Sequence, residues 1–209
     1  MKTAVLAALL LLGTARAAVE MGPSYTELAE IPGSDFSYDP PASASNSAYG
    51  SSAMFNSETW STLADQGLAM TAFELEACAM RAPHMHQRAS GLLYCTDCAN
   101  LTVAFVQENG TYVSNTISTG MSTIFPQGLL HFQYNNACTT AKYTITYDDS
   151  EGSTVNAVPS LFSLPTDLIA VSLGLSESTV ANMTVPGKFF AGPEACYNTC
   201  SSVAASGSP

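Results

Sequence analysis

Apolar and polar residues alternate along much of the chain between about residues 68 and 147. From Thr71 to Cys78 the alternation has the period of a strand with one polar face. A hairpin turn is predicted at Glu108-Asn109-Gly110. Further strands are predicted over 90–94, 101–106, 111–117, 122–125, 129–134 and 141–147. Short strands at this spacing predict an all-β fold, an antiparallel sandwich or barrel.

The two ends of the chain differ from this central part in composition and in hydrophobic pattern. Residues 18–66 are rich in Ser, Ala, Pro and Gly, which predicts an extended arm with at most a short helix near 57–64. After Pro165 the pattern becomes helical over 167–173 and 176–183, and Ser176 is a candidate N-cap. We therefore divide the chain into an arm (18–66), a barrel with C-terminal helices (67–190) and a Cys-containing tail (191–209) that is partly disordered from Ser201.

The first 17 residues have the pattern of a secretory signal peptide. Lys2 supplies the positive start, residues 4–12 form a short apolar run, and Ala15-Arg16-Ala17 is a small-residue cleavage site. The apolar run is too short to span a membrane, and no other segment is long and apolar enough. We expect a secreted, extracellular protein.

The excess of acidic over basic residues argues against negatively charged partners. Six basic residues stand against 17 acidic ones, a formal net charge of −11. Such a chain does not bind nucleic acid by releasing counterions, and anionic membrane surfaces repel it.

The six cysteines all follow the predicted signal peptide, and an even number in a secreted chain predicts disulfides. Cys95 and Cys98 form a C-x-x-C, but no second such pair and no βαβ pattern accompanies it, which favours a structural disulfide. Cys196 and Cys200 are further candidates. Asn100, Asn109 and Asn182 each begin a glycosylation sequon.

Only three histidines occur in the chain: His84, His86 and His131. On a strand, residues i and i+2 point to the same side, so His84 and His86 can converge on one point. Imidazole is largely unprotonated near neutral pH and is the commonest metal ligand there. With His131 from a distant strand, the pattern predicts a three-histidine metal site. The alternative is three unrelated surface or core histidines.

Around these histidines the sequence resembles the germin-like and spherulin-like branch of the cupin superfamily. The two segments that carry the resemblance are 83–89 and 120–135, and the flanks at 35–39 and 157–164 agree, so it spans about 33–185. The resemblance implies a jelly-roll barrel (a double-stranded β-helix) that holds a metal through three histidines and one glutamate. It also implies a homo-oligomer assembled through barrel edges and C-terminal helices. A further implication is a disulfide between Cys78 and Cys138.

One position departs from the family pattern. The glutamate expected seven residues after the first histidine is Gly91, where we expect room for a water or a small anion. Glu74 and Glu76 are candidate substitutes. Family resemblance points to manganese, but three neutral imidazoles suit zinc, copper or iron better than a hard cation. Gln133, which shares strand parity with His131, and Asn135, at a motif position, are candidates to support the ligands.

Three functions follow from this reading. The first is a secreted metal-binding cupin that acts as an oxidoreductase on a small molecule, with chemistry altered by the loss of the glutamate. The second is a non-catalytic structural or storage protein of the extracellular matrix, as spherulin-like proteins imply. The third is a three-histidine iron dioxygenase. Whether the protein is an enzyme stays open at the level of sequence.

Overall fold

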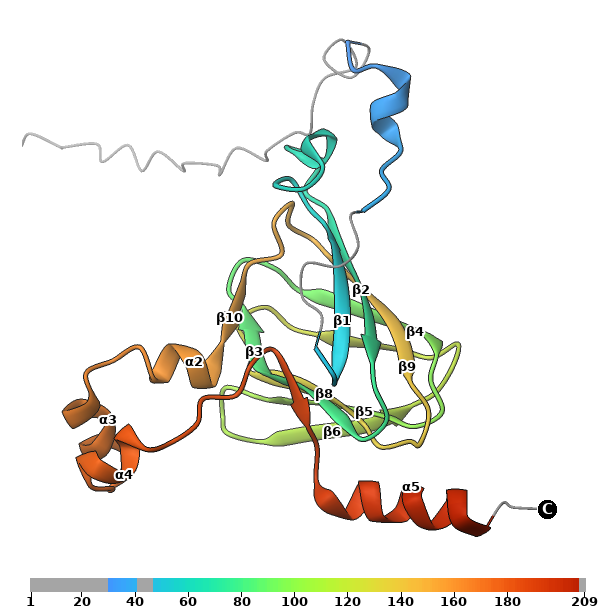
Figure 1. Cartoon of the computed structure of the whole chain (residues 1–209). Helices are drawn as coiled ribbons and strands as arrows, with labels where there is room; N and C mark the ends of the chain where they lie inside the picture. Colours follow the sequence, from blue (N-terminus) through green and yellow to red (C-terminus); the bar gives the residue numbers. More distant parts are fainter. Residues whose placement is uncertain (1–29, 41–46, 207–209) are drawn as a thin grey trace, which may run out of the picture.

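The alternating strands form two antiparallel sheets that face each other (Figure 1). The structure is a computed structural model that describes residues 30–40 and 47–206. One sheet has the order β1 (Gly50–Phe55), β2 (Ala69–Leu75), β9 (Ala141–Tyr147), β4 (Gly91–Asp97) and β7 (Ser122–Phe125). The other has the order β10 (Thr154–Asn156), β3 (Ala79–His86), β8 (His131–Asn135), β5 (Leu101–Val106) and β6 (Tyr112–Ile117), and β11 (Phe189–Ala191) also pairs with β3.

The core lies between the two sheets because alternate side chains of each strand point inward. In β4, for example, Leu93 is fully buried, whereas its neighbours Leu92 and Tyr94 are about half exposed on the outer face. The largest buried core residues include Phe73, Leu75, Leu101, Tyr143 and Ile145. The predicted antiparallel β fold is confirmed, and the bounds of the strands that were predicted differ from the observed ones by at most three residues.

The predicted arm contributes a strand that its composition did not reveal. β1 pairs with β2 along its whole length, with Ser52 opposite Phe73, although Gly, Ser and Ala dominate the segment. Pairing with a well-formed neighbour outweighs its weak strand propensity. The predicted helix near 57–64 is only a 3-10 turn, η2 (Ser61–Leu63), and a second such turn, η1 (Gly33–Phe36), precedes β1. The predicted signal peptide lies outside the described residues.

Three short helices form a unit beside the barrel. α2 (Ala157–Leu161), α3 (Thr166–Leu173) and α4 (Glu177–Ala181) follow β10 and extend away from the sheets (Figure 1). They have a small core of their own, in which Ile169, Ala170 and Val180 are buried and Phe162 packs against them. Ser176 caps α4, as predicted, by accepting a hydrogen bond from the Thr179 backbone N–H.

Beyond Ser201, where the composition predicted disorder, the structure describes a helix as far as Ser206. α5 (Glu194–Ser206) runs through that point and lies under one end of the barrel (Figure 1). The small polar residues of the tail suggested disorder, but two disulfides anchor this helix, as described below. None of the helices in the described part of the chain is long and apolar enough to cross a membrane.

Candidate metal centre

Strands β3 and β8 place the three histidines on one inward face. His84 and His86 are two residues apart on β3, and His131 on β8 is the direct cross-strand partner of His84. Each imidazole is at most 2% exposed. The spacing therefore does bring all three side chains together inside the barrel, as the sequence predicted.

The three rings form a tight cluster. The ring centroids of His84 and His131 are 4.2 Å apart, and that of His86 lies 5.2 Å from the first and 5.1 Å from the second. One nitrogen from each ring lies within 4.8 Å of those of the other two. Three nitrogens at this separation can surround a single ion.

Backbone carbonyls fix the tautomer of each ring. Nδ1 of His84 lies 2.7 Å from the Ala82 carbonyl oxygen, Nδ1 of His86 lies 2.6 Å from that of Gly152, and Nδ1 of His131 lies 2.8 Å from that of Leu129. Because a carbonyl only accepts, Nδ1 carries the proton and the lone pair is left on Nε2. The Nε2 atoms of His86 and His131 are buried without a hydrogen-bond partner. Histidines that bind a metal are commonly held by such a hydrogen bond from the other ring nitrogen.

Burial keeps these imidazoles neutral. Loss of solvation holds the pKa of His84 well below its ordinary value of 6.5, and it also lowers the pKa of His86. For His131 the same burial lowers the pKa to about 3, although the bond to the Leu129 carbonyl opposes the shift. A neutral imidazole is the form that binds a metal, so the cluster is ready to do so at neutral pH.

The carboxylates that we considered as substitutes for the missing glutamate do not reach the cluster. Glu74 pairs with Lys142, with 2.9 Å between the carboxylate oxygen and Nζ, and both side chains are about half exposed. Glu76 accepts a hydrogen bond from the Thr140 hydroxyl. Among the described residues, the histidine cluster contains no acidic member.

The space that we expected at Gly91 is filled. A Cβ added at this position would lie 3.0 Å from Cγ2 of Ile145 and 3.5 Å from Cε1 of Tyr147. The Tyr147 ring also packs against His86, with 4.6 Å between the ring centroids. Apolar and aromatic side chains from β9, and not an open gap, therefore close the barrel beside Gly91.

This close packing predicts that Gly91→Ala destabilises the protein. A contact of 3.0 Å to a β-branched core side chain requires the neighbour to move, and overpacking of this kind costs about 1–3 kcal/mol. Urea unfolding measures the loss. Gly33→Ala is the control because a Cβ there meets nothing within 4 Å. The double variant Gly91→Ala/Ile145→Ala should lose less than the sum of its single changes; strict additivity would contradict the proposed contact.

Two polar residues on β8 have different roles. Gln133 is fully buried on the face that carries His131, and neither its amide nitrogen nor its amide oxygen has a partner. Asn135 instead donates to the backbone carbonyls of Leu75, Glu76 and Thr139. Asn135 therefore ties the end of β8 to two neighbouring segments through its amide nitrogen, whereas its Oδ1 is buried without a partner. Its support of the histidines stays a prediction.

A buried arginine is the feature of the site that sequence reasoning missed. Arg81 is 2% exposed, and its Nη1 donates to Asn156 Oδ1 at 2.9 Å, whereas its Nε has no partner. No carboxylate pairs with it within 30–40 and 47–206. Burial lowers the pKa of Arg81 to about 10, so it stays cationic at neutral pH. Arg81 and His84 are three positions apart, which on a regular strand would put them on opposite faces, but a bulge between them restores a common face.

A model of the cupin family matches residues 36–181, most of the chain. The chain belongs to the cupin family. It is 29% identical over 136 residues to Spherulin-1A of Physarum polycephalum, which covers 64% of this cupin and 55% of that protein. It is 33% identical over 115 residues to a probable germin-like protein, subfamily 2 member 5, of Arabidopsis thaliana, covering 54% of each chain. The chain thus spans about half the length of the curated relatives it matches.

Solved structures agree on the fold. A recombinant oxalate oxidase in complex with glycolate superposes with a TM-score of 0.68 at 19% identity, covering 74% of this cupin and 81% of that chain. The coconut allergen cocosin superposes with a TM-score of 0.67 at 18% identity, covering 73% and 42%. At these identities the similarity shows the fold alone, and one fold can carry unrelated functions.

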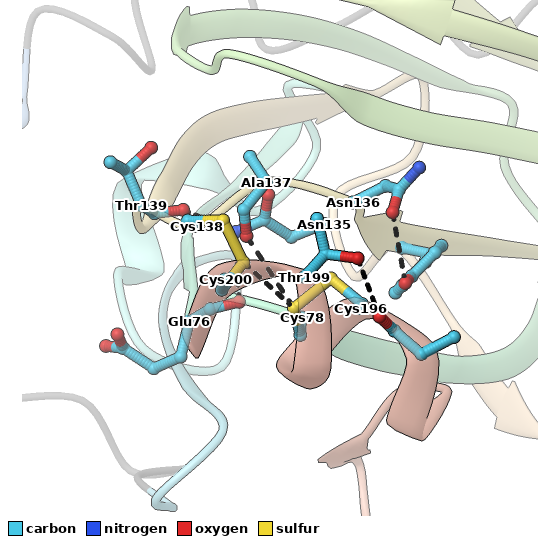
Figure 2. The surroundings of a disulfide bond; sticks show 12 residues. Glu76, Cys78, Asn135, Asn136, Ala137, Cys138, Thr139, Cys196, Thr199 and Cys200 are labelled. Carbon is cyan, nitrogen blue, oxygen red and sulfur yellow. Dashed lines mark hydrogen bonds between the residues drawn. A yellow bond between two sulfur atoms is a disulfide. The ribbon is translucent and has the colours of Figure 1, made fainter. Parts of the chain in front are cut away.

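The cysteines of this cupin pair differently from the expectation. Cys78 bonds to Cys196 and Cys138 bonds to Cys200, so the predicted pair of Cys78 with Cys138 is wrong (Figure 2). Cys196 and Cys200 lie one helical turn apart on α5 and offer both sulfurs on one side of the helix. The Cys95–Cys98 disulfide is present.

The three sequons lie at accessible positions. Asn109 and Asn182 are exposed and Asn100 is half-buried. Asn109 is in the turn between β5 and β6, where its side chain accepts a hydrogen bond from the Thr111 backbone N–H. Glycosylation at these three residues remains a prediction.

Proposed function

We propose that this cupin binds one divalent transition metal through Nε2 of His84, His86 and His131. The observation that carries the proposal is the pair of buried Nε2 atoms without partners, on rings whose Nδ1 atoms are held by carbonyls. Three neutral imidazoles without a carboxylate favour zinc, copper or iron(II) over manganese, which prefers oxygen ligands.

Elemental mass spectrometry of the purified, unchelated protein tests this proposal. We expect about one metal ion per chain, and His86→Ala should lower the content to below roughly a tenth of that, because two imidazoles alone hold a dication weakly. Gln87→Ala is the matched control, since Gln87 is exposed and adjacent to the ligand. If the two variants had the same metal content, the assignment of His86 as a metal ligand would be wrong.

We further propose that the metal-loaded protein is an oxidoreductase for a small anionic molecule. A bound transition metal would supply a Lewis acid and, for iron or copper, a redox centre. Arg81 adds a positive charge to an interior in which no described carboxylate offsets it, which favours an anionic group. The assay measures dioxygen consumption in the presence of small carboxylates. A requirement for iron(II) would favour the hypothesis of a three-histidine dioxygenase.

One observation favours a second candidate, a non-catalytic structural or storage protein. The imidazoles are so completely enclosed that no part of the ligand set offers an open face to a substrate. A metal in such a place stabilises the fold whether or not it reacts. Turnover that the histidine variants abolish would rule this candidate out, whereas a metal that raises the melting temperature without turnover would support it.

Assembly into a homo-oligomer is part of the same proposal. The unit formed by α2, α3 and α4 exposes large apolar side chains, with Leu168 at 54% and Val171 at 82%. Clusters of this kind on a projecting element mark interfaces. Val171→Asp should shift the protein toward the monomer in light scattering, whereas Ser172→Asp, at the next exposed position, should not. A monomeric wild-type protein would contradict the interface.

Secretion also stays a proposal. Three disulfides join all six cysteines, and disulfides persist in oxidising compartments such as the extracellular space. Detection of the processed protein in the culture medium of a native or heterologous secretory host tests it, and exclusive retention inside the cell would contradict it.

A further inference from the structure

The two disulfides that hold α5 are in contact with each other. Besides the bonds Cys78–Cys196 and Cys138–Cys200, the Sγ atoms of Cys78 and Cys200, which are not bonded to each other, lie 3.6 Å apart (Figure 2). The sulfur that leaves Cys138 on reduction is therefore already beside a sulfur of the second disulfide.

The two disulfides differ in how far solvent reaches them. Cys78 is fully buried and Cys196 is 8% exposed, so a dissolved thiol cannot reach this inner disulfide. Cys138 is exposed and Cys200 is half-buried. Because exchange requires a thiolate to approach a sulfur atom directly, external attack falls on the outer disulfide at Cys138.

The position of each cysteine on α5 decides where a thiolate is most stable. Cys196 is the third residue of this 13-residue helix, near the positive end of the helix dipole, and its own backbone N–H donates to the Pro193 carbonyl oxygen. Cys200 lies in the middle of the helix, away from that end. A thiolate near a helix N-terminus is stabilised and leaves more easily. The carboxylate of Glu194, in the same first turn, partly offsets this effect.

We propose that Cys138 is a site of modification by external thiols and that its modification triggers an exchange between the two disulfides. An external thiolate attacks Sγ of Cys138, forms a mixed disulfide there and expels Cys200 as a thiolate. The Cys200 thiolate then attacks Sγ of Cys78, forms Cys78–Cys200 and expels Cys196 as a thiolate, which takes a proton from water. Two disulfides exist before and after, so no further oxidant or reductant is consumed.

The exchange would move α5 without detaching it. The helix is tethered through Cys200 instead of Cys196, one turn further along, and a shift of about 1.5 Å brings the Sγ atoms of Cys78 and Cys200 from 3.6 Å to bonding distance. Cys138 is then free of the helix and carries the external thiol. A second external thiol removes that group as a low-molecular-mass disulfide, and this step is the net reduction.

A matched pair of variants tests the internal step without any reductant. Cys138→Ser leaves Cys200 as a thiol beside the inner disulfide, and we expect most molecules to carry the Cys78–Cys200 bond with a free thiol at Cys196. After acid quenching and alkylation with N-ethylmaleimide, cleavage after Tyr197 separates the two candidate positions for mass spectrometry. Label mainly on Cys200, with Cys78–Cys196 intact, would overturn the proposal.

Cys200→Ser is the control, because it cannot exchange and should carry label on Cys138 alone. The wild-type protein treated with reduced glutathione provides an independent measurement. We expect one glutathione adduct on Cys138 and alkylation of Cys196, with Cys95–Cys98 intact because both of its sulfurs are buried. A first adduct on any other cysteine would overturn the assignment of Cys138 as the entry site.

Discussion

Metal-free protein is expected to lose most of its stability as the pH falls from about 6.5 to about 3. The unfolded chain protonates His131 near its ordinary pKa of 6.5, whereas the folded chain does so only near 3. Between these values the unfolded state binds more protons, so the free energy of unfolding decreases as the pH falls. The full difference for His131 is roughly 5 kcal/mol, which is comparable to the total stability of many domains.

The other two imidazoles act in the same direction, because burial also lowers the pKa of His84 and His86. Urea unfolding of chelator-treated protein at a series of pH values measures the loss. His131→Gln should have a flatter profile, since it removes one titrating group. Bound metal should move the loss to lower pH, because protons must displace it. Stability that stays constant from pH 6.5 to 4 would contradict the burial of these rings.

Removal of the inner disulfide by Cys78→Ala/Cys196→Ala is expected to cost about 4 kcal/mol. In the unfolded chain this bond closes a loop of about 64 residues, measured through the other disulfide, and the chain-entropy model gives a cost of that size. The free energy of unfolding, from guanidinium titration at neutral pH, is the quantity to compare.

The short disulfide supplies the matched control. Cys95 and Cys98 are buried to a similar degree, so Cys95→Ala/Cys98→Ala loses comparable packing. Their bond spans only three residues in sequence, for which the same model gives about 2 kcal/mol. Equal losses in the two double variants would show that packing, and not loop closure, dominates both.

The sequence was sufficient for most of the strands and for the histidine cluster because both depend on strict periodicity. Residues 141–147 form a strand with the predicted bounds, and His84 and His86 share a face because they are two apart on a strand. Local rules of this kind need no knowledge of distant partners. β1 and α5 were missed because pairing with β2 and two long-range disulfides, respectively, stabilise segments whose composition is that of loops.

The interior of the site escaped prediction for a related reason. Arg81 faces inward only because a bulge shifts the register after it, and the one sign of that bulge in the sequence is Pro83, a residue that strands accept at bulges. The pairing of Cys78 with Cys196, and not with Cys138, depends on where α5 docks. The absence of the glutamate was visible in the sequence, whereas the packing of Ile145 and Tyr147 against Gly91 was not.

That packing has an evolutionary consequence. A mutation that restored a carboxylate at residue 91 would meet Ile145 at once, and a mutation that first shortened Ile145 would leave a void in the core. Each single step is expected to lower the free energy of unfolding, whereas the two together offset part of that loss. We therefore expect later variants of this protein to keep the three-histidine site, because each single substitution toward a glutamate at residue 91 destabilises the core.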